Sequence, residues 1–95
     1  MSGLPGLMEG RVVLVTGAAA GVGRGVAAAF GSAGAIVGIG VRRPEAAEET
    51  AAAVEAAGGT PVILRCDVTD AVQSADAIEQ LVRDFGRLDA VVHNA

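Results

Sequence analysis

Short apolar runs alternate with amphipathic stretches along most of this chain. The runs are rich in Val, Ile and Leu, and they cover Val12–Val15, Ala35–Val41, Pro61–Cys66 and Leu88–His93. Each run is short and shows little polar alternation, which is typical of parallel strands that are covered on both faces. The pattern therefore predicts four buried strands.

Three helices are predicted between these runs, because apolar residues there recur at helical spacing. A glycine closes each of them, at Gly34, at the pair Gly58-Gly59 and at Gly86. The second helix opens at Arg43-Pro44-Glu45, with its proline at an early position. The predicted inner faces are Val22, Val26, Ala29, Phe30 and Ala33 in the first helix, Ala47, Ala51 and Val54 in the second, and Ile78, Leu81, Val82 and Phe85 in the third.

The alternation of strands and helices predicts an α/β fold with a Rossmann-type parallel sheet, since parallel neighbours need right-handed crossover connections. The order βαβαβαβ corresponds to the first four strands of such a sheet. We expect a single nucleotide-binding unit over residues 1–95, with residues 1–10 as a flexible lead-in. Because the chain ends two residues after the last predicted strand, we interpret it as truncated before a catalytic half.

Composition and charge exclude several classes of function. The formal net charge of −4 argues against nucleic acid or an anionic membrane surface as a partner. All seven basic residues are Arg, so a P-loop lysine and a lysine-based catalyst are absent from these residues. The uncharged stretch Gly25–Val41 is broken by four glycines and is interpreted as a helix end, a turn and a strand, not a membrane span. No targeting signal is present, and we expect a cytoplasmic protein.

A metal site is not predicted, because one Cys and one His cannot assemble a zinc cluster. The single cysteine, Cys66, lies in an apolar run and is expected to be a buried strand thiol. The single histidine, His93, is interpreted as a residue that completes a strand end and not as a catalytic base.

The segment Thr16–Gly23 is the strongest functional signal in the chain. It stands where the first strand meets the first helix, and its glycines are spaced Gly-x-x-x-Gly-x-Gly. Glycine permits a tight turn and a close approach of the backbone to a ligand. The start of a helix offers free N–H groups and a positive dipole end to a pyrophosphate. The alternative is a plain tight turn. The residues expected to hold the cofactor here are Gly17, Ala19, Ala20, Gly21, Val22 and Gly23.

This turn resembles the cofactor loop of the short-chain dehydrogenase/reductase family, in its single-domain form, from about Gly10 to the last residue. Members of that family bind a nicotinamide dinucleotide. In the family, an acidic residue after the second strand binds the ribose of NAD, whereas an adjacent Arg binds the 2′-phosphate of NADP. Here Val41 takes the acidic position, and Arg42 and Arg43 follow it. The resemblance thus favours NADP, with Arg42 as main contact and Arg43 as helper; the alternatives are NAD and a solvated basic pair.

Two later segments match the family as well. Asp67 and Val68 look like its Asp-Val pair, in which the Asp meets the adenine amino group and the next residue lines the pocket. The alternative role is helix capping, for which we expect Thr69 or Asp70 to serve. Asn94 matches the second Asn of the family's Asn-Asn-Ala-Gly segment, which borders the cofactor ribose.

The resemblance implies hydride transfer between a nicotinamide cofactor and a small alcohol or carbonyl substrate in the full-length protein, and it allows a homo-oligomer. The family's catalytic Tyr and Lys have no counterpart, because the chain contains neither residue type. We therefore name no catalytic residue and expect this segment to be inactive alone, as the cofactor-binding half of an NAD(P)-dependent oxidoreductase. The alternatives are a non-enzymatic NADP-binding regulator and a non-functional remnant.

Overall fold

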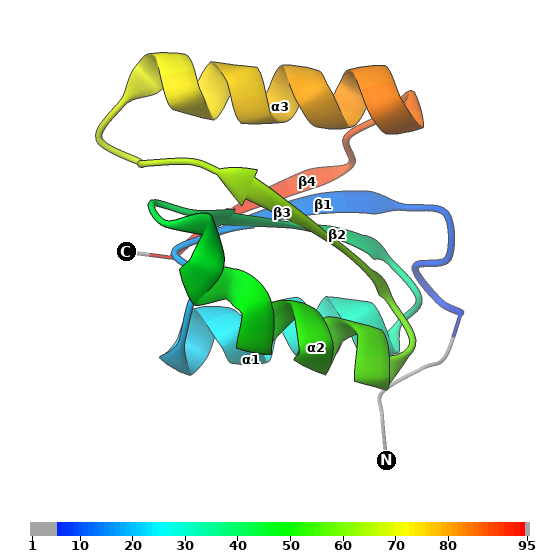
Figure 1. The fold of residues 1–95 in the computed structure, drawn as a ribbon. Helices are drawn as coiled ribbons and strands as arrows, with labels where there is room; N and C mark the ends of the chain where they lie inside the picture. The colour runs from blue at the N-terminus through cyan, green and yellow to red at the C-terminus, as the bar shows by residue number, and fades with distance from the viewer. Residues whose placement is uncertain (1–5, 95) are drawn as a thin grey trace.

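The computed structural model describes residues 6–94, which form a parallel sheet covered by helices on both faces (Figure 1). The elements, in order, are β1 (Val12–Thr16), α1 (Gly21–Ser32), β2 (Ile36–Val41), the 3₁₀ helix η1 (Pro44–Ala47), α2 (Glu48–Ala57), β3 (Thr60–Arg65), α3 (Ala71–Phe85) and β4 (Ala90–His93). Of the expected lead-in, residues 1–5 lie outside the described residues. Residues 6–10 form turns, and Met8 N donates to Ala33 O at 2.7 Å.

The strand order is β3-β2-β1-β4, and every neighbouring pair is parallel. This arrangement confirms the Rossmann-type α/β fold, and the strand ends differ from the predicted ones by one or two residues. The connections run from β1 outward to β2 and β3, and the chain then returns across the sheet to β4 beside β1. Right-handed crossovers in opposite directions place their helices on opposite faces. Accordingly, α1 and α2 cover one face and α3 covers the other (Figure 1).

Two apolar clusters lie on the two faces of the sheet. Alternate residues of β1 contribute to each: Val13 and Val15 pack on the side of α1 and α2, whereas Val12 and Leu14 pack with Leu81 of α3. All five residues of β1 are buried, as expected for a central parallel strand. The carboxyl end of β1 is therefore a rigid platform for the turn that follows it.

The inner face of α1 differs in part from the prediction, although the partly buried Val26 and Phe30 pack against the core cluster as expected. The buried residues of α1 are Gly23, Ala27 and Gly31, whereas Val22 is 73% exposed. The reason is the close approach of α1 to α2: a Cβ on Gly31 would lie 3.0 Å from the carbonyl oxygen of Val54. At that separation only the smallest residues fit between the elements, and the larger apolar side chains are displaced to the border.

The other two helices agree better with the predicted faces. In α2 and η1, Ala47 and Val54 are buried and Ala51 packs against the core, although the start of the helix is a 3₁₀ turn. In α3, Leu81 is buried as predicted, but Ile78, Val82 and Phe85 remain between 36% and 43% exposed. Within residues 6–94, α3 is the single helix on its face of the sheet, so part of its apolar surface has no neighbour to pack on.

Candidate functional site

The glycine turn lies at the carboxyl edge of the sheet, where the chain leaves β1 between β2 and β4. Connections diverge in opposite directions from this point, and open parallel sheets bind ligands in the crevice that results. A hollow of about 170 Å³ is found there. Its lining includes four of the residues predicted from the sequence to meet the cofactor: Gly17, Arg42, Val68 and Asn94.

The backbone of the turn requires glycine at specific positions. Gly17 and Gly21 have φ angles of 64° and 60°, in the left-handed region that L side chains rarely adopt. A Cβ on Gly17 would overlap the carbonyl oxygen of Asn94, and one on Gly23 would overlap the carbonyl oxygen of Gly17. Above Gly21 there is open space instead. The turn is thus packed tightly on its inner side and open on its outer side, as a phosphate cradle must be.

The first turn of α1 is electrostatically suited to an anion. Ala20 is the N-cap residue of α1, and among the described residues no side chain forms a capping hydrogen bond there. The first turn of the helix carries no acidic residue. The first N–H groups of a helix lack intrahelical partners and carry the positive end of the helix dipole. Gly21, Val22 and Gly23 occupy this turn, so the backbone at the predicted positions offers donors to a phosphate.

The end of β4 is tied to the end of β1 by polar contacts. Asn94 Nδ2 donates to Gly17 O at 3.1 Å, and Asn94 N donates to Thr16 Oγ1 at 3.4 Å. The buried Thr16 hydroxyl also lies 3.4 Å from His93 Nδ1. Asn94 therefore lies against the glycine turn, and His93 completes hydrogen bonding at the strand end, as interpreted from the sequence.

The two arginines after β2 are both exposed, and Arg42 lines the hollow beside the turn. Neither forms an ion pair with another residue in the range 6–94. The charge of Arg42 helps to lower the pKa of the Asp67 carboxyl, but it is the smallest of the effects on that pKa. Arg42 thus presents a guanidinium at the carboxyl edge without a committed carboxylate partner in the described part of the chain.

Asp67 and Asp70 have different local roles. Asp70 is the N-cap of α3, since its Oδ1 accepts from Val72 N at 3.0 Å and Gln73 N at 3.2 Å. Asp67 Oδ1 accepts from the Thr69 hydroxyl at 2.7 Å and from Thr69 N at 2.9 Å. The hydroxyl bond is the main cause, ahead of the backbone bond, that lowers the pKa of Asp67 below its ordinary value. Asp67 is therefore a carboxylate held in place at the edge of the site, and capping of α3 does not need it.

Cys66 is buried, as predicted, and its Sγ lies 3.6 Å from Ser74 Oγ. Cys66 is one of the residues that line the hollow, and it also packs in the core cluster beneath α3. Within residues 6–94, no group of three or more His, Cys, Asp or Glu side chains could hold a metal ion. No helix in this range is long and apolar enough to cross a membrane.

Two residues that contact the glycine turn were missed by the sequence analysis. Thr50 of α2 is fully buried, and its hydroxyl donates to Ala18 O at 2.6 Å. Arg24 of α1 donates from Nη2 to Ala19 O at 2.7 Å and from Nε to the Thr50 hydroxyl at 3.3 Å. The signal that could have indicated them is weak: a polar residue on the otherwise apolar inner face of the second helix.

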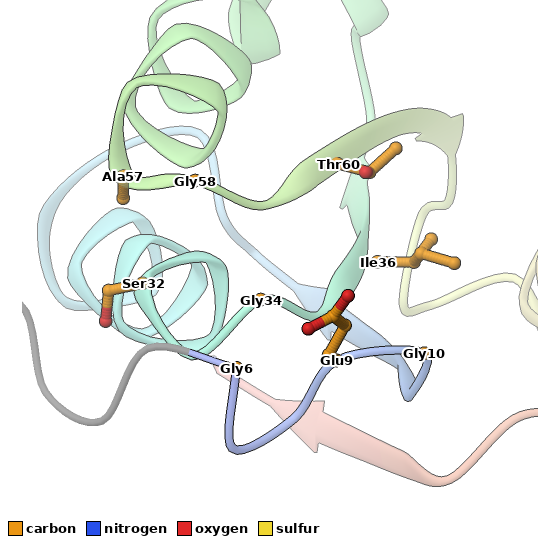
Figure 2. A pocket seen from close by; sticks show the side chains of 9 residues that line it. All are labelled: Gly6, Glu9, Gly10, Ser32, Gly34, Ile36, Ala57, Gly58 and Thr60. Carbon is orange, nitrogen blue, oxygen red and sulfur yellow. The ribbon is translucent and has the colours of Figure 1, made fainter.

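A larger hollow, about 580 Å³, lies at the opposite edge of the sheet (Figure 2). It is formed at the amino ends of β2 and β3, with Ser32 at the end of α1 and Ala57 at the end of α2. Figure 2 shows the side chains of Glu9 and Ile36 among those that line this hollow. None of the residues predicted to meet the cofactor lines it. The residues predicted to meet the cofactor therefore gather at the smaller hollow beside the glycine turn and not at the larger one.

Comparison with known proteins agrees with this assignment of the fold. The family model described as short chain dehydrogenase matches residues 11–95. An uncharacterized oxidoreductase of Methylorubrum extorquens is 39% identical over 89 residues, which cover 93% of this chain and 36% of that protein. A short chain dehydrogenase of Monascus purpureus is 46% identical over 93 residues, which cover 92% of this chain and 32% of that protein.

Among solved structures, a putative short-chain dehydrogenase/reductase from Burkholderia xenovorans matches with a TM-score of 0.87 and 36% identity. The match covers 94% of this chain and 36% of the other. The chain thus spans about a third of the length of the relatives that it matches.

Proposed function

Because the chain belongs to the short-chain dehydrogenase/reductase family, whose members use a nicotinamide dinucleotide, we propose that its glycine turn binds the pyrophosphate of NADP. The observation that carries this proposal is the turn itself. Gly17 and Gly23 allow the backbone of the turn to pack tightly, and the uncapped start of α1 offers free N–H donors to a phosphate. A bound NADP would contact the predicted backbone positions Ala19, Ala20, Gly21 and Val22.

The choice of NADP over NAD is supported by charge. A 2′-phosphate is dianionic or nearly so, and an Arg can bind it through two parallel hydrogen bonds. Arg42 lies at the hollow beside the turn and has no ion-pair partner among residues 6–94, and Arg43 is exposed next to it. The position before them is Val41, which has no carboxylate to accept bonds from ribose hydroxyls or to repel a phosphate.

The remaining contacts follow from the same edge of the sheet. Asp67 is ionised at neutral pH, since its pKa is lowered, and a carboxylate accepts well from the amino group of adenine. Val68 is 52% exposed beside it and offers an apolar surface to the ring. Asn94, held against Gly17, would border the cofactor ribose.

A nicotinamide ring bound here would supply the hydride donor or acceptor for a small alcohol or carbonyl substrate. The 95 residues include no Tyr and no Lys, so the acid/base pair that the family uses does not come from them. We propose that this chain alone binds the cofactor without turning over substrate. An assay with NADPH and a panel of ketones is expected to show no steady consumption, and turnover would refute this part of the proposal.

The test of cofactor binding is a titration of the chain with NADPH and with NADH, followed by the fluorescence of the reduced ring. Tighter binding of NADPH is expected. Arg42→Ala should weaken NADPH binding about tenfold or more while it leaves NADH binding unchanged, because it removes charge-assisted hydrogen bonds to the 2′-phosphate alone.

Arg83→Ala is the matched control, since it removes the same charge from α3, on the other face of the sheet. It should leave both affinities unchanged. Equal affinities of the wild-type chain for the two dinucleotides would refute the preference for NADP. The absence of binding to either would refute the proposed function.

A further inference from the structure

The glycine turn is also held from α2, through the backbone carbonyls of Ala18 and Ala19. Thr50 is fully buried, and a buried hydroxyl needs hydrogen-bond partners. Its proton is donated to Ala18 O at 2.6 Å, and the next carbonyl oxygen, that of Ala19, lies 3.3 Å from the same hydroxyl. The hydrogen bonds of this side chain are thus committed to the turn and not to its own helix.

Arg24 completes the contact. Its Nη2 donates to Ala19 O at 2.7 Å, its Nε donates to the Thr50 hydroxyl at 3.3 Å, and its Nη2 also pairs with Glu49 at 3.1 Å. The Arg24 side chain is 35% exposed, whereas that of Glu49 is 80% exposed. An exposed ion pair contributes little, so the two hydrogen bonds to the turn and to Thr50 carry the constraint.

These bonds fix the direction of two peptide groups. In a planar trans peptide the C=O of one residue and the N–H of the next point in opposite directions, and the described residues include no cis peptide. With Ala18 O and Ala19 O turned toward Thr50 and Arg24, the N–H groups of Ala19 and Ala20 must point the opposite way. Neither N–H has a hydrogen-bond partner among residues 6–94.

From this geometry we infer that Thr50 and Arg24 are positioning residues for the cofactor: by holding two carbonyls, they aim the Ala19 and Ala20 N–H groups at the anionic part of the dinucleotide. The inference rests on the proposed binding of NADP at this turn. Neither side chain touches the ligand in this scheme. Because the donors are already oriented before binding, the turn loses less conformational entropy when the dinucleotide binds than an unrestrained turn would.

The experiment compares Thr50→Val, which keeps the shape and loses the hydroxyl, with Thr50→Ser, which keeps the hydroxyl. NADPH affinity and the urea midpoint are measured for each. We expect Thr50→Val to weaken NADPH binding about tenfold, the scale of one lost hydrogen bond, and Thr50→Ser to restore it to within about twofold. The control is Thr60→Val, which makes the same chemical change at the amino end of β3, opposite the edge that carries the glycine turn. It should leave NADPH affinity unchanged.

A second measurement separates positioning from stability and from the proposed function. The amide signals of Ala19 and Ala20 in the unliganded chain, followed by NMR, should shift in Thr50→Val and return in Thr50→Ser. If Thr50→Val does not fold, Arg24→Met, which removes both donors but keeps an unbranched stem, replaces it with the same expected loss of affinity.

Wild-type affinity in a folded Thr50→Val or Arg24→Met chain would overturn the inference, as would a Thr50→Ser chain that binds no better than Thr50→Val. If the wild-type chain bound no NADPH, the proposed function would fail. The amide signals would still decide whether Thr50 orients the turn.

Discussion

The side-chain amide of Asn94 donates a hydrogen bond to the carbonyl oxygen of Gly17 at 3.1 Å, across 77 positions of sequence. This bond joins the end of β4 to the first glycine of the glycine turn. The backbone at Asn94 lies so close that Gly17 cannot carry a side chain. The turn is therefore held from two directions, by Asn94 at Gly17 and by Thr50 and Arg24 at the two alanines that follow it.

Asn94→Ala should destabilise the chain by about 1 kcal/mol, the net contribution of a typical hydrogen bond, because the carbonyl of Gly17 loses its partner from β4. It should also weaken NADPH binding, since the first peptide of the turn becomes free to move. Urea unfolding and NADPH titration measure the two effects. Gln80→Ala is the control, because it removes an amide from α3 that makes no hydrogen bond to the turn within residues 6–94; an equal loss in both variants would contradict the proposed tether.

Gly17→Ala should be far more damaging than Gly25→Ala. At Gly17 the added Cβ would meet the carbonyl of Asn94, and the alanine would need a left-handed backbone. We therefore expect the free energy of unfolding to fall by about 1–3 kcal/mol and NADPH binding to become undetectable. At Gly25, within α1, a Cβ would meet no atom within 4 Å. Alanine there should stabilise the helix by roughly 0.5–1 kcal/mol. Urea midpoints of the two variants test the contrast, and similar midpoints would refute it.

The sheet, the position of the turn and the end of β4 could be predicted from the sequence, because each is encoded locally. The run Val12–Val15 is apolar throughout, and Gly17 follows at the point where a strand must end. Parallel crossover rules then place Arg42, Asp67 and Asn94 at one edge without any knowledge of side-chain contacts.

The inner face of α1 could not be predicted in the same way. Nine of its twelve residues are Gly, Ala or Val, so hydrophobicity differs little around the helix, and the pattern predicts that the larger apolar side chains face inward. What decides the face is the close approach of Gly31 to Val54 of α2, which leaves no room for a larger side chain there, so Val26 and Phe30 pack only at the border. Thr50 and Arg24 were missed for a related reason. Their partners at the turn are backbone carbonyls of Ala18 and Ala19, and a backbone acceptor leaves no residue type to recognise in the sequence.

Asp70→Ala should destabilise the chain by about 1 kcal/mol, since it removes the N-cap that accepts from Val72 N and Gln73 N at the start of α3. Asp76→Ala, an exposed position inside the same helix, removes an equal charge without a cap. Thermal or urea unfolding of both variants should show a loss for Asp70→Ala alone. NADPH affinity should change little in either variant, because the capping role at Asp70 is separate from the carboxylate of Asp67 in the site.

Acid should destabilise the chain through Asp89, the residue that precedes β4. Arg87 donates to this carboxylate at 2.7 and 2.9 Å, and Val12 N donates to it at 2.8 Å. These contacts lower the pKa of Asp89 from 3.8 to about 2. The hydrogen bonds from Arg87 are the largest cause, and the bond from Val12 N–H is the next.

A carboxyl whose pKa is lower in the folded state stabilises that state when ionised, so its contribution is complete above pH 3.8 and is lost as the pH falls toward 2. Asp89→Asn should therefore have a lower urea midpoint than the wild-type chain at pH 7, and the difference should shrink between pH 4 and pH 2. Asp84→Asn, an exposed carboxyl at the end of α3, is the control and should follow the wild-type profile. A difference between Asp89→Asn and wild type that stays constant over this range would show that ionised Asp89 does not contribute in this way.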